Sequence, residues 1–211
     1  HEEDFLRRQI QSQGKGYSLF FDKIVKTDSG KRLIENIDKV HNADFSVIVY
    51  NFLDILSHAR TETQIIRDLA EDGAAFRSLT RSWFEHSDLL ELMRLLAERG
   101  HTIIITSDHG TIQVDNPVRV QGDRATSSNL RYKTGRNLGF NQKEVFAITK
   151  PELAHLPKSN ITSTYIFAYN RDFFVYPNNT NQFVRYYNNT FQHGGISMEE
   201  MIVPFLVLKP R

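Results

Sequence analysis

A chain of 211 residues, of which 40% are hydrophobic and 24% are charged, can bury one substantial core, so we expect one globular domain or most of one. The formal net charge of +1 excludes a global field that would grip nucleic acid or an acidic membrane, so any charged substrate has to be held locally. The lack of cysteine excludes disulfides and thiolate metal sites, which agrees with the cytoplasm, and no apolar run approaches the length that spans a membrane.

The first half of the chain alternates between predicted strands and predicted helices. Its first residues, "HEEDFLRRQIQSQ", start inside a predicted helix, so we expect the chain to be a piece of a longer protein. Apolar runs predict strands over residues 17–21, 45–52 and 102–106, and helical periodicity predicts helices from residue 28 and over residues 62–99. Gly100 is expected to cap the last helix, and residues 102–106 are expected to be buried on both faces. This order predicts an α/β fold with a mostly parallel central sheet and helices on both faces.

The pattern changes after Gly110. A turn at residues 115–117 predicts a hairpin or a paired loop over residues 111–120, and residues 121–141 are expected to form a long, polar, basic loop. Shorter elements follow, with strands predicted over residues 145–148, 165–169 and 173–176, a helix over residues 182–187, and a last core strand over residues 203–208.

Polar side chains follow two of the predicted strands. Asp54 and His58 come after the strand over residues 45–52, and their spacing of four puts both on one face if the chain turns helical there. Asp108 and His109 follow the strand over residues 102–106 directly. Because ligands bind at the carboxyl ends of strands in open parallel sheets, these four side chains lie where a functional site is expected.

His193 is the third candidate histidine, and the two glycines after it permit a close approach of other groups. With the preceding residues it makes a set of three imidazoles and two carboxylates, which suits zinc or manganese. Each member also has an ordinary interpretation. A D-x-x-x-H pair is more often a pair on a helix surface, an aspartate after a strand can cap a helix, and a histidine beside two glycines is usually a loop residue.

The strings "NFLDILSH", "TSDHG" and "FQHGG", in that order, resemble the metal-binding half of the alkaline phosphatase superfamily, which includes phosphatases, sulfatases and phosphodiesterases. The longer strings "SDHGTIQVDNP", "RYKTGRN" and "FQHGGISMEEMIVP" are more similar still to the PglZ domain of PorX-type response regulators. The resemblance covers essentially the whole chain, residues 1–211, and implies one partial domain of that type.

The resemblance implies two zinc ions, with manganese as the alternative. One ion would be held by Asp54, His58 and His193, and the second by Asp108 and His109 together with an early aspartate and a serine or threonine nucleophile. We expect that aspartate and that nucleophile upstream of His1, because the early candidates lie in or beside ordinary secondary structure; these are Ser18, Asp22, Thr27, Ser29 and Ser46. In PorX-like proteins a receiver domain lies further upstream. The intact protein is therefore expected to be active, and this chain alone is expected to be inactive even if it binds metal.

The expected activity is hydrolysis of a nucleotide-type phosphodiester by a two-metal mechanism, in a cytoplasmic signalling protein. Basic residues after Gly110 could bind phosphate oxygens, namely Arg119, Arg124, Arg131, Lys133 and Arg136. Lys133 and Arg136 are the best candidates because they lie in "RYKTGRN", and Tyr132 could stack on a base. For each single residue, a solvated basic loop is the simpler interpretation.

Two other functions are left open by the sequence. The domain could be a regulatory module that binds a partner or forms a homodimer and keeps its metal site for structure. It could also be a phosphomonoesterase or a sulfatase, since these share the same ligands.

Overall fold

The computed structural model describes residues 2–25, 27–122, 126–158 and 162–210. The chain divides into two compact units, each of which is described by itself. Unit 1 comprises His1–His58, Asp68–Ile105 and Leu206–Arg211, and unit 2 comprises Ala59–Arg67 and Thr106–Phe205.

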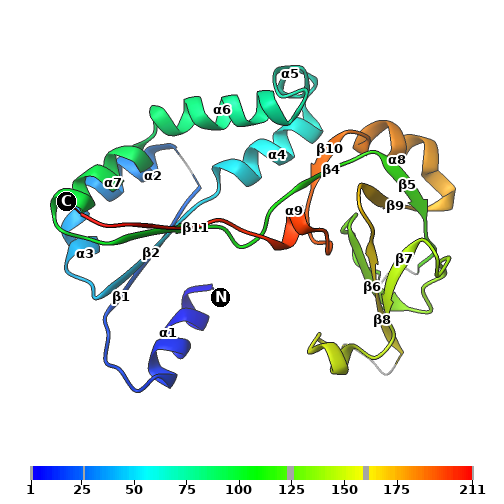
Figure 1. The fold of residues 1–211 in the computed structure, drawn as a ribbon, viewed down its shortest axis with the longest axis horizontal. Helices are drawn as coiled ribbons and strands as arrows, with labels where there is room; N and C mark the ends of the chain where they lie inside the picture. Colours follow the sequence, from blue (N-terminus) through cyan, green and yellow to red (C-terminus); the bar gives the residue numbers. More distant parts are fainter. Residues whose placement is uncertain (1, 26, 123–125, 159–161, 211) are drawn as a thin grey trace. The chain divides into compact units, whose positions relative to one another are not determined.

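Most of the helices and strands are labelled in Figure 1. In chain order they are α1 (Glu2–Ser12), β1 (Leu19–Ile24), α2 (Thr27–Glu35), α3 (Ile37–His41), β2 (Phe45–Tyr50), α4 (Phe52–Glu62), α5 (Gln64–Leu69), α6 (Gly73–Glu85), α7 (Asp88–Glu98), β3 (Ile103–Thr106), β4 (Ile112–Val114), β5 (Asn116–Arg119), β6 (Tyr132–Arg136), β7 (Val145–Ile148), the 3-10 helix η1 (Pro151–Ala154), β8 (Ser163–Ala168), β9 (Asp172–Val175), η2 (Pro177–Asn179), α8 (Thr180–Tyr187), β10 (Thr190–Gln192), α9 (Met198–Met201) and β11 (Phe205–Leu208).

Unit 1 is built on a parallel pair of strands with helices packed on it. β1 and β2 pair in parallel, with Leu19 opposite Phe45. The apolar faces of α2, α3 and α7 supply the core because their buried residues recur at helical spacing; these residues are Leu33, Ile37, Val40, Leu92 and Leu96. Side chains from β1, β2 and β3 pack against this core. The prediction that the helical region before Gly100 packs on strands is therefore confirmed for α7.

The expected helical stretch over residues 62–99 is interrupted. Asp72 accepts a hydrogen bond from the backbone N–H of Ala75 at the start of α6, and Ser87 accepts one from Leu90 at the start of α7, so each break is a capped helix start. Gly100 follows α7 with a φ of +85°, which fits the predicted cap. Among the helices that the structure describes, none combines the length and apolar composition that crossing a bilayer requires.

Two strands expected to be buried are exposed. β3 alternates between half-buried and exposed residues, and Ile104 is 52% exposed, so its burial on both faces is a wrong prediction. β11, expected as a core strand, pairs with β3, and all four of its residues are exposed. A continuous apolar run therefore predicts the presence of these strands correctly, but it does not predict how deeply they are buried.

Unit 2 consists of short strands. β4 pairs antiparallel with β10, β5 pairs in parallel with β9, and β8 lies between β6 and β7 in an antiparallel sheet. The cores of this unit are apolar clusters on these strands, one around Val118, Ile166 and Phe174 and another around Val114 and Phe173.

The predicted hairpin over residues 111–120 is wrong. The backbone N–H groups of Asp115 and Asn116 both donate to the carbonyl of Arg171, so the turn redirects the chain instead of reversing it. β4 and β5 consequently pair with β10 and β9 and not with each other. The expected loop over residues 121–141 contains a strand, β6, whose polar sequence "YKTGR" hides it from a search for apolar runs.

The expected mostly parallel central sheet is not found in the described residues. They form five separate sheets of two or three strands, and parallel pairing is limited to β1 with β2 and β5 with β9 among the pairs of known direction. The antiparallel pairs lie after Gly110, where β4 pairs with β10 and β8 pairs with β6 and β7, and these partners are not contiguous in the sequence. The mixture of α-helices and strands remains as predicted.

Candidate metal centre

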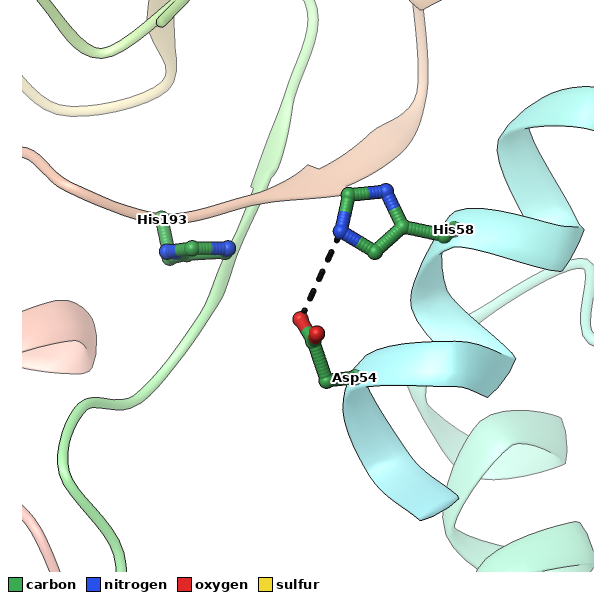
Figure 2. A group of neighbouring side chains, drawn as sticks. All are labelled: Asp54, His58 and His193. Atoms are coloured by element: carbon green, nitrogen blue, oxygen red, sulfur yellow. Dashed lines mark ion pairs between the residues drawn. The ribbon is translucent and has the colours of Figure 1, made fainter. Parts of the chain in front are cut away.

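Asp54 and His58 lie one turn apart on α4, which begins two residues after β2 ends. The ring of Phe52 stacks on Trp83 with the centroids 4.0 Å apart, which anchors the start of the helix in unit 1. Asp54 Oδ1 is 3.5 Å from His58 Nε2, and the dashed line in Figure 2 marks this contact. The side chains are 43% and 65% exposed, so both are open to an ion from solvent.

Asp108 and His109 lie in unit 2, in the turn that follows β3. The Asp108 carboxylate accepts a hydrogen bond from the backbone N–H of His109, and its side chain is 89% exposed. The ring Nδ1 of His109 is 3.0 Å from the carbonyl oxygen of Gly110. Because a carbonyl only accepts, Nδ1 carries the proton in this contact, and Nε2 lies 3.7 Å from the Asp108 carboxylate. A backbone carbonyl that holds one ring nitrogen in this way is common for metal-ligating histidines.

His193 follows β10 in unit 2, and its side chain is labelled in Figure 2. Its ring stacks on that of His109 with the centroids 3.9 Å apart and an angle of 9° between the planes. The carbonyl oxygen of His193 accepts a hydrogen bond from the side-chain amide of Asn129. The structure thus brings together two predicted ligands from loops that are far apart in the sequence.

These donors fit a divalent metal of the zinc or manganese class. Carboxylate oxygen and neutral imidazole nitrogen are the ligands that such ions take, and thiolate is not required. Unit 1 by itself carries one carboxylate and one imidazole on α4, and unit 2 by itself carries Asp108 and the stacked imidazoles of His109 and His193.

The basic residues after Gly110 differ in their accessibility. Arg119 and Arg136 are exposed, and Arg124 lies outside the described residues. Arg131 is fully buried in an ion pair with Glu200, which takes its guanidinium out of reach of a substrate. Sequence composition alone does not separate these cases.

Lys133, a predicted phosphate contact, lies on the packed side of β6. It is 1% exposed, its Nζ donates to the carbonyl of Ser127, and the same atom lies 4.8 Å from the centroid of the Tyr176 ring. Burial lowers the pKa of the ammonium group to about 8. Its role in substrate binding stays a prediction, and Arg136 at the exposed end of the same strand is the more accessible of the two.

Ser18 and Ser46, two of the early hydroxyl candidates, take part in local structure, and the side chain of Thr27 lies outside what the structure describes. Ser18 Oγ donates to the carboxylate of Asp44, and Ser46 Oγ donates to the carbonyl of Val40. Asp22 accepts a hydrogen bond from the backbone of the next residue. The location of the nucleophile stays a prediction.

Two residues that hold the histidine loops were missed by the sequence interpretation, namely Asn129 and Glu200. Glu200 is almost fully buried and its carboxylate bonds to Arg131, while Asn129 bonds to the His193 carbonyl. The sequence does contain a signal for Glu200. Ser197 is followed three residues later by Glu200, and this is the capping-box pattern that α9 displays. Asn129 has no comparable signal.

A family model described as the alkaline phosphatase-like PglZ domain of the BREX system matches residues 2–208. The matched range includes all five predicted metal ligands. No curated protein matches the chain.

Proposed function

Because the chain belongs to the family of PglZ alkaline phosphatase-like domains, we propose that it is the metal-binding part of a metal-dependent phosphodiesterase that acts on nucleotide-type phosphodiesters. An alkaline phosphatase-like domain has a phosphoesterase-type fold, and such domains typically depend on metal ions. The observation that carries the proposal is the stacking of His109 on His193, because it joins the two histidine loops of unit 2 around one group of donor atoms.

The proposed ligands divide into two sets. Asp54, His58 and His193 hold one ion, and Asp108 with His109 contributes to the second. Support for the pair on α4 is its contact within unit 1, where Asp54 Oδ1 lies 3.5 Å from His58 Nε2. Support for His193 comes from unit 2, where the guanidinium of Arg60 donates to the carbonyl of Asn189, just before β10, the strand that leads to His193.

When bound, two divalent ions activate an oxygen nucleophile and stabilise charge on the phosphate oxygens and the leaving group. The protein's own contribution is to orient its donors. The carbonyl of Gly110 accepts a hydrogen bond from His109 Nδ1, so Nε2 is the ring nitrogen proposed to bind the metal, and Asp54 and Asp108 offer carboxylate oxygens. The formal charge of the ions is thereby partly balanced by these carboxylates.

Substrate contacts are proposed for the exposed part of β6. Arg136 is exposed and always charged, so it can donate to phosphate oxygens, and Tyr132 on the same strand offers a ring for a base. Zinc is the proposed metal, with manganese as the alternative, and the proposed setting is a signalling protein, as the resemblance to response-regulator PglZ domains implies.

The test compares the intact protein with the Asp54→Ala variant, using a chromogenic phosphodiester after loading with zinc or manganese. We expect turnover by the intact protein and a fall in kcat/KM of at least about 100-fold in the variant, since even partners of metal ligands cost 10–100-fold when removed. Elemental analysis of both proteins shows whether the metal is lost together with the activity.

Asp38→Ala is the matched control, because it removes an exposed carboxylate of unit 1 that pairs with Arg99. The control is expected to keep metal content and rate. A protein that binds metal but turns over no phosphodiester would indicate a regulatory module instead. Faster turnover of a chromogenic phosphate monoester or sulfate ester would reassign the substrate class.

A further inference from the structure

Glu200 lies at the centre of a buried hydrogen-bond network in unit 2. Its carboxylate accepts two hydrogen bonds from Arg131, through Nε at 2.9 Å and Nη2 at 2.8 Å. It also accepts hydrogen bonds from the backbone N–H of Gly195 at 2.8 Å and from the hydroxyl of Ser197 at 2.7 Å. The two side chains of the ion pair are 0% and 1% exposed. The carboxylate is therefore fully satisfied, and its position is determined by partners on several sides.

Arg131 connects this carboxylate to a different part of the unit. Its Nη1 donates to the carbonyl of Tyr169, in the turn after β8, and to that of Asp172, the first residue of β9. The backbone of Arg131 is itself fixed, because its carbonyl accepts from the N–H of Ala168. The guanidinium thus connects the carboxylate of Glu200 to the backbone around β8 and β9.

The backbone of Glu200 holds the His109 loop. Its carbonyl oxygen accepts a hydrogen bond of 2.8 Å from the N–H of Gly110, the residue whose own carbonyl holds the His109 ring. A Cβ at Gly110 would lie 2.0 Å from the carbonyl oxygen of Glu199, so only glycine permits this approach.

The side chain of Glu200 holds the His193 loop. Gly195, two residues after His193, donates its N–H to the carboxylate, and a Cβ there would lie 2.7 Å from Glu200 Oε2. Gly194 has a φ of +102°, which favours glycine, and a Cβ on it would lie 2.8 Å from the side-chain nitrogen of Asn129. The glycines beside both histidines are thus required by groups that pack against their backbone.

We propose that Glu200, fixed by Arg131, is the positioning residue that holds the His109 and His193 loops in register, so that both imidazoles are preorganised for metal binding. This inference rests on the proposed function, which makes these histidines ligands. One residue bonds to both loops, through its backbone to one and through its side chain to the other. A buried ion pair is often no more stabilising than an apolar pair, so stability alone does not account for this one.

The experiment measures zinc binding to the metal-free protein by competition with a chelator, for wild type and Glu200→Gln. The amide can no longer accept from Arg131, Gly195 and Ser197 together, so we expect the zinc affinity to fall by about 10- to 100-fold. NMR spectra of the metal-free proteins provide a second readout, in which the amide signals of Gly110 and Gly195 and the imidazole signals of His109 and His193 are expected to shift or broaden.

Two further variants separate positioning from stability. Ile166→Ala creates a cavity in a core cluster of unit 2, so it is expected to lower the melting temperature while the zinc affinity and the loop signals stay close to wild type. Ser197→Ala removes one hydrogen bond to the carboxylate and is expected to shift both readouts in the same direction as Glu200→Gln, but less. It also serves as the test variant if Glu200→Gln does not fold.

The outcomes are distinguishable. A folded Glu200→Gln with wild-type loop signals and wild-type zinc affinity would overturn the inference, as would an equal loss of affinity in Ile166→Ala. If wild type binds no zinc or manganese, the proposed function fails, and the loop signals of the metal-free proteins still decide whether Glu200 positions the two histidines.

Discussion

At the scale of single residues, His41 and His101 form a pair in unit 1 that makes stability depend on pH. His41 Nδ1 and His101 Nε2 are 2.8 Å apart, so one nitrogen donates a hydrogen bond and the other accepts it. Burial, followed by the charges of His41 and Arg99, lowers the pKa of His101 below its ordinary value. Arg99 itself pairs with Asp38.

We expect the free energy of unfolding to decrease as the pH falls from about 7.5 towards 5.5. The unfolded chain takes up the proton on His101 near its ordinary pKa, while the folded chain resists it until a lower pH, so protons favour the unfolded state in this window. Urea unfolding at both pH values provides the measurement. In His101→Phe the decrease should be smaller than in wild type, and an equal decrease would refute the assignment. His155→Asn, which removes an exposed histidine of unit 2, is the control.

The candidate site could be predicted in part at this scale. The contact of Asp54 with His58 could be predicted, because residues four apart in a helix lie on the same face. The stacking of His109 on His193 joins loops that are far apart in the sequence, so the spacing of residues along the chain does not predict it. Arg131 was grouped with solvated basic residues because its burial depends on Glu200, a partner far along the chain.

At the scale of elements, α7 stabilises unit 1 through the side chains on its buried face. Leu92 is 2% exposed and belongs to the core cluster of unit 1. Leu92→Ala should lower the free energy of unfolding by about 2–5 kcal/mol, the usual cost of a cavity in place of a buried leucine. Metal content per folded molecule should not change.

Leu69→Ala at the end of α5 is the matched control, because the same side chain is 57% exposed there. Its effect should stay within about 0.5 kcal/mol, as for most surface substitutions. Chemical denaturation with metal analysis measures both quantities. Equal losses of stability in the two variants, or metal loss in Leu92→Ala without loss of stability, would contradict the assignment of α7 to the core.

Elements were predictable where one local signal dominates. The strands β2, β7 and β9 and the helix α8 lie close to their expected positions, since apolar runs and helical periodicity mark them. β6 was missed because pairing with β8 stabilises a polar sequence, and strand propensity depends on such neighbours. The predicted pairing directions were wrong for the same reason, because the sequence of a strand does not identify the strand with which it pairs.

At the scale of the whole molecule, the exposed apolar strand β11 predicts association between chains. All four of its residues are apolar and exposed, and Val207 is 49% exposed. Exposed apolar strands are templates for contact with another chain, so we expect a concentration-dependent homodimer or larger species by light scattering. Val207→Lys should shift this equilibrium towards the monomer.

Leu153→Lys is the control for this prediction. Leu153 is 76% exposed on η1 of unit 2, away from β11 in the sequence, so adding a charge there should leave the association unchanged. A wild-type protein that stays monomeric at all concentrations, or an equal response of the two variants, would exclude β11 as the contact.

The buried pair of Arg131 and Glu200 also has a consequence for the order of folding. The two residues are 69 positions apart, so the pair forms only after a long loop has closed, and contacts of that separation arise late. Asp54 and His58 need only one helical turn, which forms in less than about a microsecond. A divalent ion present during refolding therefore meets the α4 pair first, and the imidazoles of His109 and His193 become available to it only at the end of folding.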